Sequence, residues 1–181
     1  TMSTHIALMN LGELQQFAAP LELYAQPANR FAADFLGNPR INFLAGVVEE
    51  TAGDLVARCG TLTVPLAGAV GLQRGSGVTV GLRAEEFGFV SESDSTVPAT
   101  NAEVTATLPT GTDWYYRVRY GDTEVMVREN DHPNLAPGSS VRLAAFPNPI
   151  KVFGADGLLA PVTATAAPTG HAQGAAPTLS S

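Results

Sequence analysis

The side chains best suited to catalysis are two acidic pairs and three dispersed histidines. The pairs are Glu49-Glu50 and Glu85-Glu86, and we place each of them on a strand. Successive side chains of a strand point to opposite faces of the sheet, so a pair would not converge on one substrate atom as an acid–base pair must. His5, His132 and His171 lie too far apart to predict a triad or a metal cluster. We therefore expect no catalytic and no metal-binding residue.

Phosphate-binding and thiol chemistry are also not indicated. No loop of the type G-x-x-x-x-G-K-[ST] occurs in the sequence. Gly75-Ser76-Gly77 is rich in glycine, but a strand pattern follows it, so no helix N-terminus would face a phosphate there. Cys59 has no Cys or His neighbour at metal-ligand spacing. We interpret it as a small hydrophobic residue on a strand.

The segment Trp114 to Tyr120 carries the most informative surface. Alternation places Trp114, Tyr116, Val118 and Tyr120 on one face, which predicts a barrel core. Tyr115, Arg117 and Arg119 then form an outward face that is polar or binds a partner. Stacking of nucleic-acid bases is the alternative for aromatic and Arg side chains in this pattern. The net charge of −7 opposes it, because nucleic-acid binders need a basic surface.

Short strands separated by turn residues must position these side chains. We expect strands over Ala45–Thr51, Leu55–Arg58, Val78–Arg83, Phe87–Val90, Glu103–Leu108, Trp114–Tyr120, Glu124–Arg128, Val141–Phe146 and Lys151–Phe153. This pattern is typical of a small β-barrel or sandwich. Two glycine turns, at residues 74–77 and 136–138, each lead into a strand, which suggests two related half-barrels.

The two ends of the chain differ from this middle region. Ile6–Met9 and Leu14–Phe17 predict a hairpin, Pro20 predicts the start of a helix, and residues 28–36 predict a second helix that Gly37 ends. Residues 162–181 contain no charged residue and are expected to be disordered. No apolar run approaches the roughly 20 residues of a membrane span, and no signal peptide is visible. These observations favour a cytoplasmic location.

Residues 20–24 (PLELY) and 27–44 (PANRFAADFLGNPRINFL) resemble a stretch shared by MalK-like ABC ATPases. These proteins are the energy-coupling subunits of carbohydrate and glycerol-phosphate importers. Residues 3–12 are similar to the last hairpin of the family's ATPase domain, and residues 81–86 to a Gly-Ile-Arg-Pro-Glu-His segment of its regulatory domain. The sequence departs from the family pattern at Thr4-His5, Ala18-Ala19, Ala84 and Glu86. Ala18-Ala19 removes a Thr that would cap the helix.

The resemblance implies a mainly β chain with three parts. Residues 1–39 would be a short α/β remnant of an ABC ATPase domain, residues 40–161 an OB-fold-like (TOBE) β-barrel regulatory domain, and residues 162–181 a tail. The complete subunit would bind ATP and Mg. Its phosphate loop, signature motif, catalytic acid and switch histidine would all lie before Thr1, so no catalytic residue or cofactor is expected in this chain, and His5 is not the switch histidine.

The resemblance also implies a function and partners. The complete subunit would couple ATP hydrolysis to uptake of sugars or sn-glycerol-3-phosphate, and residues 38–43 favour the sugar branch over iron, polyamine or molybdate importers. Partners would be a second copy, the permease subunits and a regulatory protein, at the inner face of a bacterial plasma membrane. The alternative is an OB module of another importer that binds a small ligand such as an oxyanion.

Five residues are candidates for the contact with the second copy. They are Arg83 and Glu85, whose opposite charges would pair across a two-fold axis, and Tyr115, Arg117 and Arg119 of the outward face. The alternative for Arg83 and Glu85 is that they brace a barrel turn within each subunit, contributing under about 1 kcal/mol if exposed.

Overall fold

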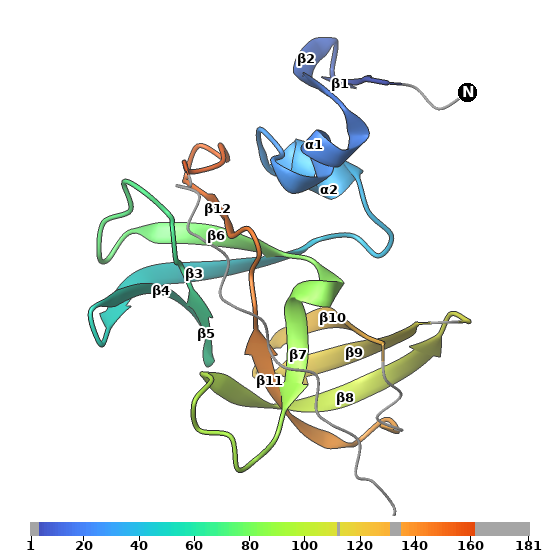
Figure 1. Ribbon diagram of the computed structural model, residues 1–181, viewed down its shortest axis with the longest axis vertical. Helices are drawn as coiled ribbons and strands as arrows, with labels where there is room; N and C mark the ends of the chain where they lie inside the picture. The colour runs from blue at the N-terminus through green and yellow to red at the C-terminus, as the bar shows by residue number, and fades with distance from the viewer. Residues whose placement is uncertain (1–3, 112, 131–134, 162–181) are drawn as a thin grey trace, which may run out of the picture.

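The computed structural model describes residues 4–111, 113–130 and 135–161, and strands dominate it (Figure 1). An N-terminal hairpin and two short helices come first, followed by ten strands and one turn of 3-10 helix, η1. The elements are β1 Ile6–Asn10, β2 Glu13–Ala18, α1 Pro20–Ala25, α2 Arg30–Phe35, β3 Asn42–Thr51, β4 Asp54–Cys59, β5 Leu62–Pro65, β6 Gly77–Leu82, η1 Ala84–Glu86, β7 Phe87–Val90, β8 Ala99–Pro109, β9 Trp114–Tyr120, β10 Thr123–Glu129, β11 Ser140–Ala145 and β12 Lys151–Phe153. The mainly β fold that the sequence predicts is confirmed.

Local chemistry fixes the two helices. Pro20 occupies the first turn of α1, and Ala19 at its N-cap makes no side-chain cap, as the sequence predicts. The second helix is capped conventionally, because the Asn29 side chain accepts a hydrogen bond from Ala32 N at 2.9 Å. The rings of Phe31 and Phe35 lie on one face of α2, with their centres 6.4 Å apart.

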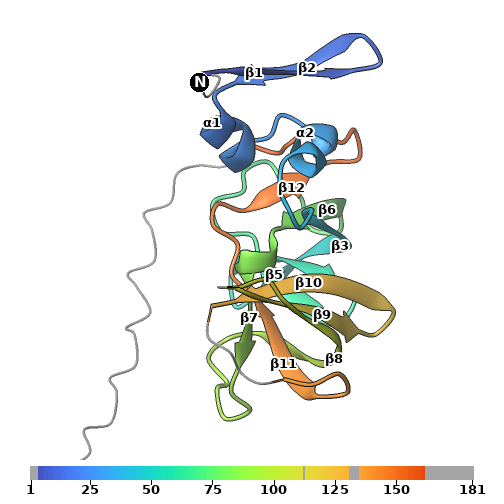
Figure 2. The same cartoon turned by 90° about the vertical axis from the view of Figure 1, so that its right-hand side faces the viewer.

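The helices stand between the hairpin and the barrel (Figure 2). Backbone bonds join them to the chain's later part: Arg30 N donates to Gly157 O at 3.1 Å, and Leu159 N donates to Ala28 O at 3.2 Å. The Arg30 guanidinium also lies over the Phe43 ring, 4.8 Å from its centre. The helical segment is therefore held by the barrel as well as by the hairpin.

The ten strands of the barrel region form two antiparallel sheets of five strands each. Their orders are β12-β6-β3-β4-β5 and β7-β11-β8-β9-β10. We call β3 to β6 the first half and β8 to β11 the second half. The sheet of each half is completed by the strand that follows the other half in sequence. β7 follows β6 but pairs with β11, and β12 follows β11 but pairs with β6. A curled sheet of five strands is the form that an OB-fold-type barrel takes.

The two glycine turns of the sequence occupy equivalent places in this arrangement. Gly75 N donates to Val48 O and Gly138 N donates to Val104 O, each at 2.8 Å. Val48 N and Val104 N in turn donate to the serine after each glycine, both at 2.9 Å. The two glycines have φ of +85° and +90°, which favours glycine at both. The structure thus repeats itself, as the weak sequence repeat suggests.

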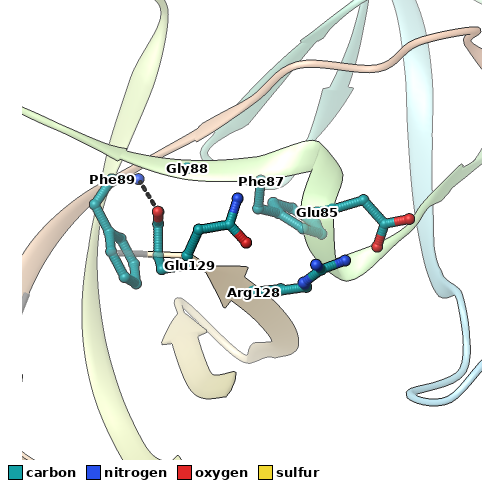
Figure 3. Close-up of a pocket in the computed structure, with 7 residues that line it drawn as sticks. Glu85, Phe87, Gly88, Phe89, Arg128 and Glu129 are labelled. Atoms are coloured by element: carbon teal, nitrogen blue, oxygen red, sulfur yellow. Dashed lines mark hydrogen bonds between the residues drawn. The ribbon is translucent and has the colours of Figure 1, made fainter. Parts of the chain in front are cut away.

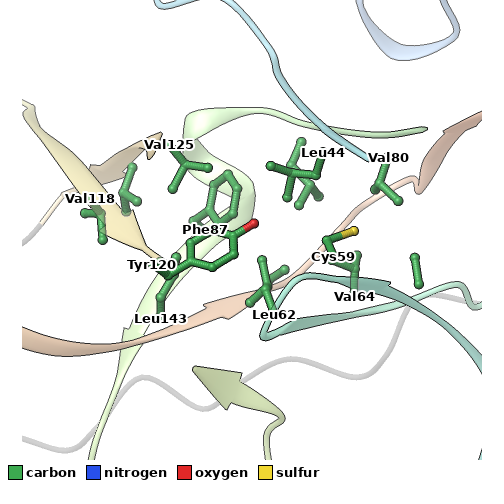
Figure 4. Packing of buried hydrophobic residues seen from close by; sticks show 14 of the residues in the cluster. Leu44, Cys59, Leu62, Val64, Val80, Phe87, Val118, Tyr120, Val125 and Leu143 are labelled. Atoms are coloured by element: carbon green, nitrogen blue, oxygen red, sulfur yellow. The ribbon is translucent and has the colours of Figure 1, made fainter. Parts of the chain in front are cut away.

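One hydrophobic core lies between the two sheets (Figure 4). It takes its largest fully buried side chains from both halves, among them Leu62, Val80, Tyr116 and Leu143. Cys59 belongs to this core, and burial raises the pKa of its thiol to about 11. The interpretation of Cys59 as a buried hydrophobic residue is confirmed.

The strand predictions hold with three corrections. β3 and β8 begin earlier than predicted, at Asn42 and Ala99. The sequence does not predict β5, because this strand has four residues and ends at Pro65. Glu85-Glu86 lies in η1 rather than on a strand, so the prediction from strand alternation is wrong for this pair. The tail prediction falls on residues 162–181, which lie outside the described residues.

Candidate functional site

The predicted interface residues of β9 lie on the outer face of the second-half sheet. Arg117 Nε lies 3.3 Å from Glu124 Oε1, and Arg119 Nη2 lies 3.2 Å from Glu103 Oε2. These pairs join β9 to β10 and β8, and all four side chains are between 48% and 51% exposed. Each pair contributes under about 1 kcal/mol in this setting. The face is therefore charged but balanced within one chain.

The alternation predicted for β9 is confirmed. Tyr116, Val118 and Tyr120 are buried, whereas Arg117 and Arg119 are exposed. Burial raises the pKa of Tyr116 and of Tyr120, in each case as the largest cause. Tyr115 is partly buried on the outer face, opposite Arg128 of β10 in the strand register.

Arg83 does not lie on the surface. It is 2% exposed, its Nη1 donates to Leu36 O at 2.5 Å, and its guanidinium carbon lies 3.7 Å from the centre of the Tyr24 ring. A Cβ at Gly37 would come within 2.5 Å of the same Nη1, and Gly37 has φ of +130°, so glycine is required there. Pairing of Arg83 with Glu85 across a two-fold axis does not fit this burial. Arg83 instead braces the junction of the helices and the barrel.

Glu85 is exposed at the edge of the same junction. Its Oε1 accepts a hydrogen bond from the Tyr24 hydroxyl at 2.5 Å. Burial raises the pKa of Tyr24 to about 12, and the bond to Glu85 adds to the rise because a carboxylate disfavours a phenolate beside it. Tyr24 therefore stays neutral and continues to donate to Glu85 over the physiological range.

Glu86 and Lys151 form a buried ion pair that the sequence does not indicate. Lys151 Nζ lies 3.1 Å from Glu86 Oε1, and the residues are 3% and 6% exposed. Glu86 also accepts from Arg83 N at 2.7 Å and from Asn148 N at 3.0 Å. The pair therefore ties the turn before β7 to the turn before β12, where the two halves exchange strands. The one feature of the sequence that could have drawn attention to this ion pair is that Lys151 is the single lysine of the chain.

A polar pocket of about 360 Å³ lies between β7 and β10 (Figure 3). Its lining residues are Glu85, Phe87, Gly88, Phe89, Arg128, Glu129 and Asn130. Phe89 N donates to Glu129 Oε1 at 3.1 Å across one end, and Arg128 is held at the other by Asp113 at 3.1 Å. The sequence does not predict this pocket, and Glu85 is the only lining residue that the sequence analysis names as a candidate.

The N-terminal hairpin carries a second exposed surface, which is apolar. Only Leu8 and Ala18 of its strands are buried, against Leu23 and Ala32 of the helices. Met9, Leu11, Leu14 and Phe17 are between 52% and 99% exposed. Exposed apolar faces are common where a protein contacts another surface.

The described part of the chain contains no cluster of metal ligands and no membrane-spanning helix. No group of three or more His, Cys, Asp or Glu could hold a metal ion among residues 4–111, 113–130 and 135–161. Within those residues, no helix is long and apolar enough to cross a membrane. His5 stacks on Phe17 at 5.1 Å between ring centres. His132 and His171 lie outside the described residues.

Comparison with known proteins identifies relatives of one functional class. The chain is 36% identical over 143 residues to an uncharacterised ABC transporter ATP-binding protein, y4oS, of Sinorhizobium fredii, covering 79% of the chain and 37% of that protein. It is 32% identical over 143 residues to the sn-glycerol-3-phosphate import ATP-binding protein UgpC of Salmonella typhimurium, covering 79% of the chain and 39% of the relative. It is 37% identical over 150 residues to the spermidine/putrescine import ATP-binding protein PotA of Rubrobacter xylanophilus, covering 80% and 39%.

The chain thus spans about two fifths of the length of the curated relatives that it matches. Among solved structures, the cytoplasmic molybdate-binding protein ModG aligns with a TM-score of 0.46 and 18% identity, over 61% of this chain and 94% of that protein. No protein-family model matches the chain.

Proposed function

The chain belongs to the family of ABC transporter ATP-binding subunits, and we propose that it is the C-terminal regulatory and dimerising portion of an importer subunit. The observation that carries the proposal is the identity of 32–37% over about four fifths of the chain to subunits of this class. In this proposal, ATP and Mg bind elsewhere in the complete subunit, which is peripheral on the inner face of the bacterial membrane through its permease partners.

The exposed surface of the hairpin supports different contacts for the two ends of the chain. Its exposed residues Met9, Leu11, Leu14 and Phe17 offer an apolar face and two strand edges. Burying such a face against further strands is favourable by about 25 cal/mol per Å² of apolar area. We propose that this face docks on the remainder of an ATPase domain, while the two-sheet region contacts a second copy.

The contact with the second copy is assigned to the outer face of β8, β9 and β10. Two-fold contacts need a self-complementary patch, and rows of Arg and Glu side chains can exchange partners between two copies of one face. Tyr115, Arg117 and Arg119 are the central residues of this proposal, with Glu85 at the margin. Arg83 has no part in it, because its guanidinium is buried.

Sedimentation equilibrium over a range of concentrations tests the assignment. We expect a reversible dimer that weakens at least fivefold in Arg119→Glu and in Tyr115→Ala. Arg58→Glu is the matched control, because Arg58 is also paired with a glutamate and 41% exposed, but on the first-half sheet. A parent chain that stays monomeric at high concentration would reject self-association. A dimer that only the control variant weakens would move the contact to the other sheet.

The transported solute is proposed to be a sugar or sn-glycerol-3-phosphate. The basis is the segment at residues 38–43 and the relative named for sn-glycerol-3-phosphate import. A relative named for spermidine/putrescine import is as similar, so polyamine uptake is the competing outcome. Uptake of labelled sugars, sn-glycerol-3-phosphate and spermidine, compared in cells with and without the complete gene, separates the two. Loss of spermidine uptake alone would overturn the proposed solute class.

A further inference from the structure

The pocket between β7 and β10 is lined by polar groups of both signs (Figure 3). Glu85 and Glu129 contribute carboxylates, and Asn130 contributes an amide. Arg128 contributes a guanidinium, and residues 87–89 of β7 complete the lining. The volume of about 360 Å³ is within the range of about 300–1,000 Å³ found for small-molecule sites. The pocket therefore has the size and the polarity to hold a small polar molecule.

Two buried donors beside the pocket have no hydrogen-bond partner in the described part of the chain. They are Arg128 Nε and the Tyr116 hydroxyl. The Tyr116 ring packs edge-on against Phe89 with ring centres 5.6 Å apart, and the charge of Glu129 adds to the rise that burial causes in the pKa of Tyr116. Both donors thus lie next to residues of the lining. Because an unsatisfied buried donor is unfavourable, a molecule that brings oxygen acceptors to this place would be stabilised there.

The two carboxylates impose the opposite requirement on the same molecule. An ionised carboxylate only accepts hydrogen bonds, so a ligand must donate to Glu85 and Glu129 while it accepts from Arg128. An anion would be repelled by the carboxylates, and an ammonium ion has no lone pair to offer the guanidinium. A hydroxyl group both donates and accepts. A neutral molecule with several hydroxyls therefore fits this lining better than an anion or a cation.

The bonds already made by these side chains leave capacity for such a ligand. Glu85 accepts from the Tyr24 hydroxyl and Glu129 accepts from Phe89 N, in both cases on Oε1. A carboxylate has about four lone-pair sites, so one bond does not saturate it. Arg128 donates to Asp113 through Nη2, and a guanidinium has five donors in all.

We propose that this pocket binds a small, neutral, polyhydroxylated molecule of the size of a monosaccharide. Its hydroxyls donate to the carboxylates of Glu85 and Glu129 and accept from Arg128. Because Glu85 also accepts the hydroxyl of Tyr24 in α1, the bound molecule lies where the helices meet the barrel. The site is defined by the pocket alone and does not depend on the importer assignment. A failure here leaves the proposed function intact.

Titration of the whole chain with matched hexoses, followed by amide chemical shifts in NMR, tests the proposal. The probe is D-glucose, with myo-inositol as a second neutral polyol, D-glucose 6-phosphate as the anion and D-glucosamine as the cation. For at least one neutral polyol we expect saturable shifts at Gly88, Phe89 and Arg128 with a Kd of about 1 mM. Binding of the phosphate should be at least about fivefold weaker, and D-glucosamine should not bind more tightly than D-glucose.

Three variants locate the bound polyol. Glu85→Ala should weaken its binding at least about fivefold, because a hydrogen bond to a charged group is lost. Glu49→Ala is the matched control and should leave binding unchanged, since Glu49 is a 42% exposed carboxylate of the first-half sheet. Tyr116→Phe should weaken binding about threefold but leave the urea midpoint unchanged or higher, because the hydroxyl has no described partner in the unbound chain.

Three results would each overturn the proposal. The first is that neither D-glucose nor myo-inositol gives saturable shifts along β7 at concentrations up to about 50 mM. The second is that the phosphate or D-glucosamine binds more tightly than both neutral polyols, which would assign the pocket to an ion. The third is that Glu85→Ala binds the polyol as tightly as the parent chain does.

Discussion

Replacing Lys151 by methionine is expected to destabilise the fold more than removal of any other cation whose ion pair is described above. The change keeps most of the side-chain volume but removes the charge that lies 3.1 Å from Glu86 Oε1. Glu86 would then remain 6% exposed, with Arg83 N and Asn148 N as its hydrogen-bond donors. A buried carboxylate without a cation is strongly unfavourable.

The size of the effect follows from the geometry. At 3.1 Å and an effective dielectric constant of about 20, the attraction within the pair is about 5 kcal/mol. Desolvation of both groups offsets much of this in the intact pair, but in Lys151→Met the carboxylate keeps its desolvation without the attraction. We therefore expect a loss of about 3–5 kcal/mol in the free energy of unfolding. For a chain of this size, that corresponds to a Tm lower by roughly 6–20 °C.

Urea denaturation followed by the fluorescence of Trp114, the single tryptophan, measures the loss. The double variant Glu86→Gln/Lys151→Met removes both charges, and we expect it to regain about 2 kcal/mol relative to Lys151→Met. Arg119→Met is the matched control, because its ion pair with Glu103 is half exposed and its loss should stay under about 1 kcal/mol.

The reasoning would be refuted by a Lys151→Met variant within about 1 kcal/mol of the parent chain, or by single losses that simply add in the double variant. Either result would mean that Glu86 reaches water, or another partner, once the lysine is gone.

Three further predictions concern other parts of the molecule. Because burial raises the pKa of Cys59 to about 11, its thiol should react with a disulfide reagent at pH 8 at least tenfold more slowly in the native chain than in urea; equal rates would contradict its burial. Because the pKa of Tyr24 rises from 10 in the unfolded chain to about 12 in the fold, the folded state binds more protons between these values, so stability should fall as pH rises from 10 to 12. The urea midpoint of Tyr24→Phe should fall less over this pH range than that of the parent chain. An equal fall in both would mean that another group causes it. On the hairpin, Leu14→Ser should change stability by no more than about 0.5 kcal/mol, whereas Leu8→Ala should cost about 2–5 kcal/mol; comparable losses for both would show that Leu14 is not exposed.

Features set by local pattern could be predicted from the sequence. The faces of β9 follow from strict alternation along Trp114 to Tyr120, and α1 follows from Pro20 at its first position. The repeat of the halves is visible in the two glycine turns, because each turn needs a positive φ beside the start of a strand.

Features set by distant contacts could not be predicted. Glu86 and Lys151 are 65 positions apart, and Arg83 meets Leu36 at a separation of 47. The sequence predicts only that Arg83 ends a strand, and the packing of Tyr24 and Gly37 on it is what shows that the guanidinium is covered. The β7 pocket depends on which strand β7 joins, and pairing with β6 or β11 would satisfy its apolar pattern equally well. Alternation determines the faces of a strand, but not its neighbours.

The exchange of β7 and β12 has a consequence during synthesis on the ribosome. The first-half sheet needs β12, and Lys151 lies 70 positions after its partner Gly81. At about 5–20 residues per second, roughly 4–14 s pass between translation of the two. During that interval one edge of β6 is unpaired, and β7 has no partner until β11 is made. Both can then pair with the same strands of a neighbouring chain on the same message. Polysomes that make this protein therefore hold matching half-sheets close together, and slower translation after residue 90 should increase interchain strand exchange.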